Sequence, residues 1–278
     1  MLTVFLVETI IIVIGYQNTM NLKVTELDLR INKDAGRLES LNIVMISDIH
    51  INALTTKKKL RNIIKLINEQ SPDIVLFVGD IVDTQIDPFN KQNLGTLFLA
   101  INSKYGIFAV TGNHEYIGDH IKTINSLSKY GVTFLRDDVI KIENSFYLVG
   151  REDLSAYRSL KKKRKSLKDL IVNNNKKYPI LLMDHQPIDL DIASDNGIDL
   201  QMSGHTHNGQ LFPFNLITDL LFELPWGYLK KGETHYYVSC GVGTAGIPLR
   251  TGSYPEIVNI KLIFNENKNS NKYISSSK

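Results

Sequence analysis

Four short runs of consecutive apolar residues constrain the fold of this chain more than any other feature. A strand with one solvated face alternates apolar and polar residues, whereas a strand buried on both faces needs an unbroken apolar run. The runs lie at residues 43–46, 74–78, 107–110 and 180–183. We therefore expect core strands of a sheet that is covered by helices on both sides.

The segment between the first two runs has the spacing of an amphipathic helix. Its large apolar residues recur at i, i+3, i+4 and i+7: Leu60, Ile63, Ile64 and Ile67. This spacing puts them on one face of a helix, so a strand–helix–strand unit is expected. Further strands are predicted at residues 198–202, 236–239 and 256–263, the last with Val258, Ile260 and Leu262 on one face. These elements predict an α/β fold with a mixed sheet.

Length and composition favour one large domain with short appendages. The 278 residues are 43% hydrophobic and 22% charged, which excludes a chain that is disordered throughout. We expect an N-terminal apolar segment at residues 1–20, one domain at 21–264 and a polar, disordered tail at 265–278. The 32 Lys and Arg against 29 Asp and Glu are too balanced for a protein that coats nucleic acid, so no such partner is expected.

The N-terminal segment leaves three interpretations open. Residues 2–16 are apolar apart from Glu8, but they fall short of the roughly 20 residues that cross a bilayer comfortably. The segment is a membrane anchor, a secretory signal that lacks the usual basic start, or a buried helix or strand. Lys23, Arg30, Lys33 and Arg37 follow it. For an anchor, whether spanning or peripheral, these charges place the domain at the cytoplasmic face of the cell membrane.

Histidines at predicted strand ends are the candidates for chemistry. Cys240 is the only cysteine, so a metal would be held by His, Asp, Asn or Glu. Five of the seven histidines adjoin an Asp, an Asn, a Gly or another His in the segments Asp48-Ile49-His50, Asn113-His114, Asp184-His185 and Gly204-His205-Thr206-His207. One residue between two ligands would point both side chains to the same side of an extended segment. This pattern indicates a metal site.

Two further positions complete the expected site. Asp80 follows Gly79 directly after a predicted strand, where its carboxylate could bridge two cations. The amide oxygen of Asn113 is a hard neutral ligand, and the adjacent His114 suits a catalytic role beside the metals. Parallel strands gather such loops beyond their carboxyl ends, so these side chains are expected to meet in one cleft.

The ordered motifs resemble the calcineurin-like metallophosphoesterases. They are Asp48-Ile49-His50, Gly79-Asp80-Ile81-Val82-Asp83, Gly112-Asn113-His114-Glu115, His185 and Gly204-His205-Thr206-His207. Stretches at residues 149–153, 184–187, 208–210, 241–243 and 248–250 resemble the membrane-associated bacterial branch of that family. The resemblance implies that residues 21–264 form a metallophosphoesterase domain, a four-layer α/β/β/α sandwich with mixed sheets.

The resemblance also implies a dinuclear metal site. One cation would be held by Asp48, His50, Asp80 and His207, and the other by Asp80, Asn113, His185 and His205. Ligands of nitrogen and oxygen favour Mn, Fe or Zn. Two cations roughly 3.5 to 4 Å apart lower the pKa of a water between them, so metal-bound hydroxide is the expected nucleophile.

Two residues beyond the ligands take catalytic roles by the same resemblance. His114 would stabilise the transition state or protonate the leaving oxygen, and Asp83 would orient its ring. The expected function is hydrolysis of a phosphate ester or pyrophosphate, on a small molecule or on a lipid-linked substrate. The alternatives are a phosphodiesterase or nuclease of the same fold and a non-catalytic metal-binding interaction module.

Three other features have two or more interpretations. Arg151 and Arg250 would contact substrate phosphates or form surface salt bridges. The apolar segment at residues 211–226 would line a pocket for a lipid chain, enter a bilayer surface or pack on the core as a small helix. The five basic residues at 161–165 would touch anionic lipid headgroups or form a solvated helix face.

Overall fold

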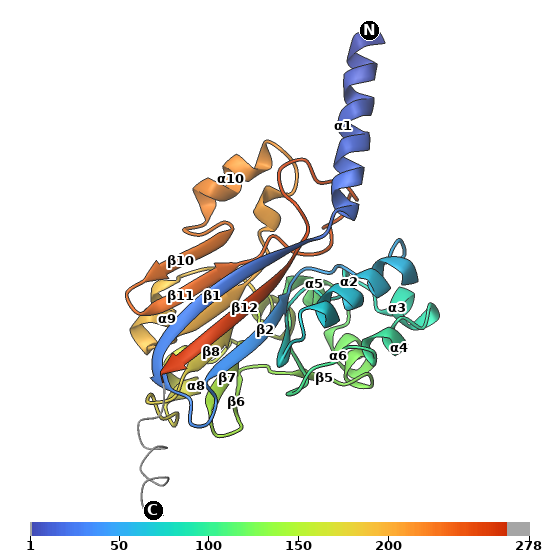
Figure 1. The fold of residues 1–278 in the computed structure, drawn as a ribbon. Helices are drawn as coiled ribbons and strands as arrows, with labels where there is room; N and C mark the ends of the chain where they lie inside the picture. Colours follow the sequence, from blue (N-terminus) through green and yellow to red (C-terminus); the bar gives the residue numbers. More distant parts are fainter. Residues whose placement is uncertain (1, 266–278) are drawn as a thin grey trace, which may run out of the picture.

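The computed structural model describes residues 2–265, which form two six-stranded sheets packed face to face (Figure 1). The first sheet has the order β1-β12-β2-β3-β4-β5. Its strands are β1 (Lys23–Asp34), β2 (Ser40–Ile46), β3 (Ile74–Val78), β4 (Ile107–Val110), β5 (Val132–Phe134) and β12 (Glu256–Asn265). Neighbours are parallel except β12 and β2, which are antiparallel, so the sheet is mixed.

The second sheet is also mixed and has the order β10-β11-β9-β8-β7-β6. Its strands are β6 (Asp138–Ile142), β7 (Phe146–Gly150), β8 (Ile180–Met183), β9 (Leu200–Ser203), β10 (Gly227–Lys231) and β11 (Thr234–Val238). The strands β7, β8, β9 and β11 run parallel, and β6 and β10 close the two edges as antiparallel partners. The parallel centre of this sheet supplies the second half of the candidate site.

Helices are the other regular elements of the described residues. They are α1 (Leu2–Met20), α2 (Lys57–Glu69), α3 (Asp87–Lys91), α4 (Gly95–Phe98), α5 (Asn113–Ile117), α6 (His120–Ser128), α7 (Ala156–Leu160), α8 (Leu167–Ile171), α9 (Asp191–Asn196), the short η1 (His207–Gly209) and α10 (Phe214–Leu221). The helices α2, α3, α4 and α6 pack on the first sheet, and α8 and α9 pack on the second. The expected four-layer α/β/β/α arrangement is confirmed.

The alternation of side chains along β2 explains the unbroken apolar run at residues 43–46. Ile43 and Met45 belong to the core between the two sheets. Val44 and Ile46 point the other way, into the core beneath α2. Burial on both faces therefore demands an apolar residue at each of positions 43–46. One face is covered by helices and the other by the second sheet, so the expectation of helices on both sides of a sheet is wrong. The runs at 74–78, 107–110 and 180–183 are strands with these same bounds.

The helix α2 forms as its spacing predicts. The hydroxyl of Thr56 caps its first turn by accepting a hydrogen bond from the backbone N–H of Lys59 at 3.2 Å. The four apolar residues of the predicted face are all buried: Leu60, Ile63, Ile64 and Ile67. The strand β1 was not predicted, although charged and apolar residues alternate in it; among residues 2–265 its one strand partner is β12. Period-two alternation was the signal that would have revealed it.

The N-terminal helix α1 projects from the domain (Figure 1). It is long and apolar enough to cross a membrane by length and composition, although no membrane is present. Most of its residues are exposed, so the interpretation as a buried helix or strand is wrong. Among the described residues, the last turns of α1 form its hydrogen bonds to the domain. The carbonyl of Gly15 accepts from the backbone N–H of Arg250 at 2.9 Å, and the Asn18 amide donates to the Arg250 carbonyl at 3.0 Å.

Three other expectations have clear outcomes. Asn265, predicted to start the tail, is the last residue of β12, and the remainder of that tail lies outside the described residues. The helix α10, in the apolar segment at 211–226, has no buried residue, so the interpretation that it packs on the core is wrong. Residues 162–165 are not helical, and Arg164 donates to Asp184 at 2.8 Å. The interpretation of 161–165 as a solvated helix face is therefore also wrong.

Shortening a side chain of β12 that lies in the core between the sheets should lower the free energy of unfolding substantially. Replacing the fully buried Ile260 with Ala should lower the free energy of unfolding by about 2–5 kcal/mol, because a cavity remains between the sheets. The exposed neighbour Lys261 is the matched control, and Lys261→Ala should change it by about 0.5 kcal/mol or less. Denaturant unfolding in detergent measures both, and equal effects would contradict the assigned core.

Candidate metal centre

The predicted ligands lie in loops at the carboxyl ends of parallel strands from both sheets. Asp48 follows β2, Asp80 follows β3, and Asn113 follows β4 at the start of α5. His185 follows β8, and His205 and His207 follow β9. Because the sheets pack face to face, the two sets of loops meet at one end of the sandwich. The structure thus brings together all seven residues predicted as metal ligands.

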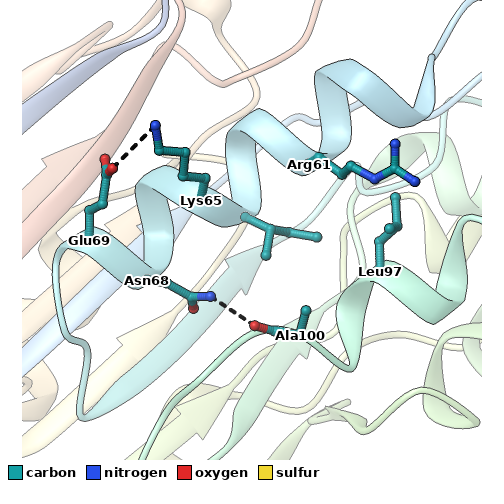
Figure 2. A pocket seen from close by; sticks show the side chains of 7 residues that line it. Arg61, Lys65, Asn68, Glu69, Leu97 and Ala100 are labelled. Carbon is teal, nitrogen blue, oxygen red and sulfur yellow. Dashed lines mark hydrogen bonds and ion pairs between the residues drawn. The ribbon is translucent and has the colours of Figure 1, made fainter.

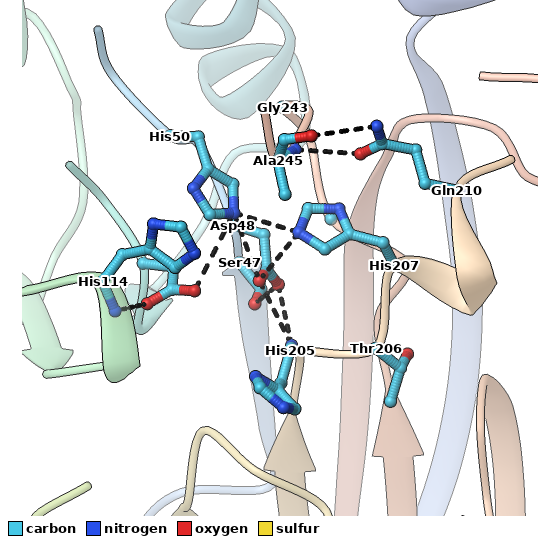
Figure 3. A network of polar contacts seen from close by, with 12 residues as sticks. Ser47, Asp48, His50, His114, His205, Thr206, His207, Gln210, Gly243 and Ala245 are labelled. Atoms are coloured by element: carbon cyan, nitrogen blue, oxygen red, sulfur yellow. Dashed lines mark hydrogen bonds and ion pairs between the residues drawn. The ribbon is translucent and has the colours of Figure 1, made fainter. Parts of the chain in front are cut away.

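The first group contains Asp48, His50 and His207. The Nε2 atoms of His50 and His207 are 2.9 Å apart, and Figure 3 shows the two rings facing each other beside the Asp48 carboxylate. Asp48 Oδ1 lies 3.4 Å from His207 Nε2 and 3.8 Å from His50 Nε2. All three side chains are buried. Their ligand atoms are close enough to bind one ion.

The second group contains Asp80, His185 and His205, with Asn113 beside them. Asp80 Oδ2 is 3.3 Å from His185 Nε2. The amide oxygen of Asn113 lies 2.8 Å from His205 Nδ1 and 3.3 Å from His185 Nε2. The ligand atoms of Asp80, His185 and His205 all lie within 4.8 Å of one another. Oxygen and nitrogen donors therefore converge on a second point.

Asp80 lies between the two groups. The same Oδ2 atom that approaches His185 is 3.8 Å from His50 Nε2 in the first group. Its Oδ1 accepts a hydrogen bond from the backbone N–H of His114 at 2.8 Å. Asp80 is therefore placed where a bridging carboxylate would have to be.

The backbone at the ligand pairs differs from the expected extended segment. The φ angles are +54° at Asp48, +50° at His50, +72° at His205 and +50° at His207. These values lie in the left-handed region, which costs energy for residues other than glycine. Asp48 and His50 converge on one group, whereas His205 and His207 enter different groups; each pair lies where the chain turns sharply, so the explanation from an extended strand is wrong. Surrounding packing holds these turns in place.

His114 is the centre of a third cluster with His50 and Asp83. The Nδ1 atom of His114 is 2.7 Å from the Asp83 carbonyl and 2.9 Å from Asp83 Oδ1. Both neighbours are acceptors, which puts the ring proton on Nδ1 and leaves Nε2 with a free lone pair when the ring is neutral. The His50 and His114 rings meet edge to face at 4.6 Å. His114 therefore borders the first group.

Tight backbone approaches support the second group. His185 Nδ1 lies 2.7 Å from the Val78 carbonyl, which accepts its proton and leaves Nε2 free as a ligand. Gly79 has φ +83°, and a Cβ atom there would collide with the His185 ring. A Cβ at Gly112 would collide with the Asp80 carboxylate. Both positions therefore require glycine.

The electrostatics keep Asp80 charged and His207 neutral. Burial raises the pKa of Asp80, but the nearby His185 and His50 rings outweigh it and lower the pKa below the usual value. Burial and the neighbouring His50 and Arg250 lower the pKa of His207. An ionised carboxylate and a neutral imidazole are the forms that bind metals, and Asp80 and His207 have them. Despite burial, Asp80 raises the pKa of His185, and Asp83 and Asp80 raise that of His50, so a metal ion would have to displace a proton from these two rings.

The donor set fits metal ions. Asp48 and Asp80 are buried, and among residues 2–265 neither carboxylate forms an ion pair with a Lys or an Arg. Buried carboxylates need a compensating positive charge. The close approach of the His50 and His207 nitrogens also needs a proton or a cation between the two lone pairs. One metal ion at each group would meet both needs.

Glu115 is a supporting residue that the sequence analysis quoted within a motif without giving it a role. Its side chain is buried and accepts from three backbone N–H groups, those of Asp80 and Val82 at 3.0 Å and that of Gly112 at 2.7 Å. Burial and the charge of Asp80 raise its pKa, while the Val82 and Gly112 donors oppose that rise. Glu115 thus joins the loops after β3 and β4.

Neither predicted arginine is available to a substrate. Arg250 is fully buried and donates to the carbonyls of Cys240 at 2.7 Å and Gly241 at 3.1 Å, while its Nη2 lies 3.2 Å from His207 Nδ1. Arg151 is 6% exposed and pairs with the buried Asp184 at 3.1 Å. Both earlier interpretations, phosphate contact and surface salt bridge, are therefore wrong. Arg250 instead packs behind His207 and fixes the loop that carries it.

A separate hollow of about 490 Å³ lies between α2 and the segment after α4 (Figure 2). The Lys65–Glu69 ion pair lies at 3.6 Å along its rim, and the Asn68 amide donates to the Ala100 carbonyl at 2.8 Å. None of the predicted ligands lines it. The hollow is therefore not a candidate for the chemistry.

Comparison with known proteins gives consistent matches. A model of the calcineurin-like phosphoesterase family matches residues 41–209. A transmembrane protein with metallophosphoesterase domain from Danio rerio is 32% identical over 86% of this chain and 57% of its own length. An uncharacterized metallophosphoesterase from Helicobacter pylori strain J99 is 32% identical over 81% of this chain and 60% of its own length.

A third relative matches over most of its own length. It is an uncharacterized metallophosphoesterase from Aquifex aeolicus, 32% identical over 78% of this chain and 83% of its own. The chain spans less than two thirds of the length of the Danio rerio and Helicobacter pylori proteins. The family model covers every predicted ligand from Asp48 to His207.

The position of Glu115 predicts that it is needed to hold the metals. In Glu115→Gln one carboxylate oxygen becomes an NH₂ group that faces backbone donors, at a cost of about 1–3 kcal/mol for each N–H left unpaired. We expect a lower metal content after dialysis, measured by mass spectrometry. The exposed Glu69→Gln on α2 is the control. Equal metal content in the two variants would show that Glu115 does not support the ligands.

Proposed function

Because the chain belongs to the calcineurin-like phosphoesterase family, we propose that it is a hydrolase that uses two metal ions to cleave a phosphate ester or pyrophosphate. The observation that carries this proposal is the convergence of buried carboxylates and imidazoles on two adjacent points with Asp80 between them. We also place the chain in the membrane-associated bacterial branch of the family as part of the same proposal.

We assign each ligand to one of two ions according to the group in which it lies. Asp48, His50, Asp80 and His207 would hold one ion, and Asp80, Asn113, His185 and His205 would hold the other. When bound, the ions supply activation of a water molecule and neutralisation of charge on the phosphoryl group. Nitrogen and oxygen donors with four imidazoles favour Mn, Fe or Zn.

His114 and Asp83 carry the proposed roles beyond the ligands. Asp83 holds the Nδ1 proton of His114 with both its carbonyl and its carboxylate, so the ring orientation is fixed. A protonated Nε2 could then donate to the leaving oxygen, or hydrogen-bond to a phosphoryl oxygen as charge develops. Both side chains are partly exposed, so a substrate could reach them.

The proposed substrate is lipid-linked, and a cavity beside His50 supports this. The cavity has a volume of about 710 Å³ and lies between the end of α1, the start of α2 and residues 242–248. Tyr16 and Met20 of α1 give it an apolar wall, and Lys58 and Lys59 of α2 give it a cationic one. Burial and the charge of Arg250 lower the pKa of Lys59. An amphiphilic phosphate matches both walls.

We also propose that α1 anchors the protein in the cell membrane. The length and composition of α1 support a span, and the Danio rerio relative is named as a transmembrane protein. The basic residues that follow α1, among them Lys23 and Arg30, favour a cytoplasmic position for the domain.

Removing the shared carboxylate should abolish activity. With Mn added, the wild type should hydrolyse at least one of an aryl phosphomonoester, an aryl phosphodiester and a nucleotide-diphosphate lipid. Metal-stripped wild type and Asp80→Asn should not, because the bridging charge is lost. The exposed Asp87→Asn on α3 should behave as wild type.

The panel also separates the alternatives. Preference for the lipid supports the proposed substrate, and preference for the diester favours a phosphodiesterase. A fully metallated wild type that is inert on all three compounds would contradict the proposal and favour an interaction module. Activity retained in Asp80→Asn would remove Asp80 from the site.

His114 should affect turnover without affecting metal binding. His114→Asn should lower kcat by about 10²- to 10⁴-fold, the range of a positioned proton donor. Its metal content should match wild type, because His114 lies outside both ligand groups. Parallel kinetics and metal analysis test this, and unchanged kcat would exclude His114 from the reaction.

A further inference from the structure

The helix α10 exposes an unusual amount of apolar surface at one end of the molecule. Its side chains are largely solvent-accessible, with exposed fractions of 87% for Leu220 and 71% for Leu221. The other large apolar residues exposed on the helix and in the turn before it are Phe212, Phe214, Leu216 and Ile217. We define this set of six residues as the α10 surface. Contiguous apolar surface of this kind marks an interaction site.

The position of α10 in the fold favours one partner for this surface. The helix lies at the same end of the molecule from which α1 projects (Figure 1). Two hydrogen bonds to the segment at residues 250–251 connect the two helices. The Phe212 N–H donates to the Thr251 hydroxyl at 3.0 Å, and the Arg250 N–H, one residue away, donates to the Gly15 carbonyl of α1 at 2.9 Å. Ile247, 58% exposed, lies in the same loop.

The charges of residues 211–226 favour apolar contact with a lipid bilayer over electrostatic binding to an anionic partner. Residues 211–226 contain no Lys or Arg and two acidic residues, Asp219 and Glu223. Such a segment has no electrostatic attraction to acidic headgroups or nucleic acid. Burial of apolar side chains at the boundary between headgroups and acyl chains remains as the driving force.

We propose that the α10 surface is a second membrane contact, which inserts into the headgroup region of the bilayer that α1 crosses. This inference rests on the proposed anchoring by α1 and is independent of the proposed hydrolysis. With two points of contact, the domain is held in one orientation on the membrane. The cavity between α1 and α2 then opens beside the bilayer, where a lipid-linked substrate is found.

The single buried cysteine makes a site-specific test possible. Cys240 is buried, so a maleimide fluorophore that responds to polarity will label Leu220→Cys selectively. Leu99→Cys is the matched control, because Leu99 is 65% exposed and lies next to α4, away from α1 and α10. Labelled full-length protein is reconstituted into phosphatidylcholine vesicles, with and without lipids that carry a nitroxide. Wild type treated with the same reagent gives the background.

The expected result is severalfold stronger quenching by the nitroxide lipid at position 220 than at 99, with weaker quenching by aqueous iodide. Equal exposure of both positions to iodide would overturn the proposal. Protection of position 220 from both quenchers would also overturn it, because a protein, such as a second copy of the chain, would then cover α10.

A flotation control and a second cysteine variant separate failure of the α10 contact from failure of the experiment. Flotation of wild type with the vesicles is measured first, and failure to float contradicts anchoring by α1 rather than the α10 contact alone. Leu216→Cys, 53% exposed on the same helix, replaces Leu220→Cys if that variant does not fold. Hydrolysis is not the readout, so an inactive enzyme leaves the result interpretable.

Discussion

The packing of the two sheets against each other is the constraint on which the site depends. Asp48, His50, Asp80 and Asn113 follow strands of the first sheet, and His185, His205 and His207 follow strands of the second. The short contacts of the site cross between the sheets, as between His50 and His207 and between Asp80 and His185. A shift of one sheet over the other would separate both groups. The apolar core that joins the sheets therefore also sets the distances between the donors.

The site concentrates negative charge where water is excluded. Asp48 and Asp80 are buried, and their nearest partners are imidazoles, backbone donors and a serine hydroxyl. Carboxylates in such surroundings are costly until a cation compensates them. Binding of metal and stability of the fold are therefore coupled in this chain, because the ions would offset a penalty that folding creates. Glu115 adds a third buried carboxyl, which backbone N–H groups satisfy.

The end of the molecule that carries α1 and α10 is linked to the site through one short segment. Arg250 is bonded to α1 through its backbone and to the loop of His207 through its side chain. The turn that leads into α10 is bonded to Thr251, the next residue. The helix α1, the exposed apolar helix α10 and the predicted ligand His207 thus share one support.

The sequence by itself determined the strands buried on both faces, the face of α2 and the short segments that carry the candidate ligands. Those features are local, because periodicity and motif spacing report which side chains a segment must bury or present. Only the tertiary structure decided that the ligand pairs sit on left-handed backbone, that Arg250 is internal and that α10 lies exposed at the same end of the molecule as α1. These depend on contacts between segments far apart in the chain, where packing overrides local preference. A buried arginine and a substrate-binding arginine look the same in sequence, since only their surroundings differ.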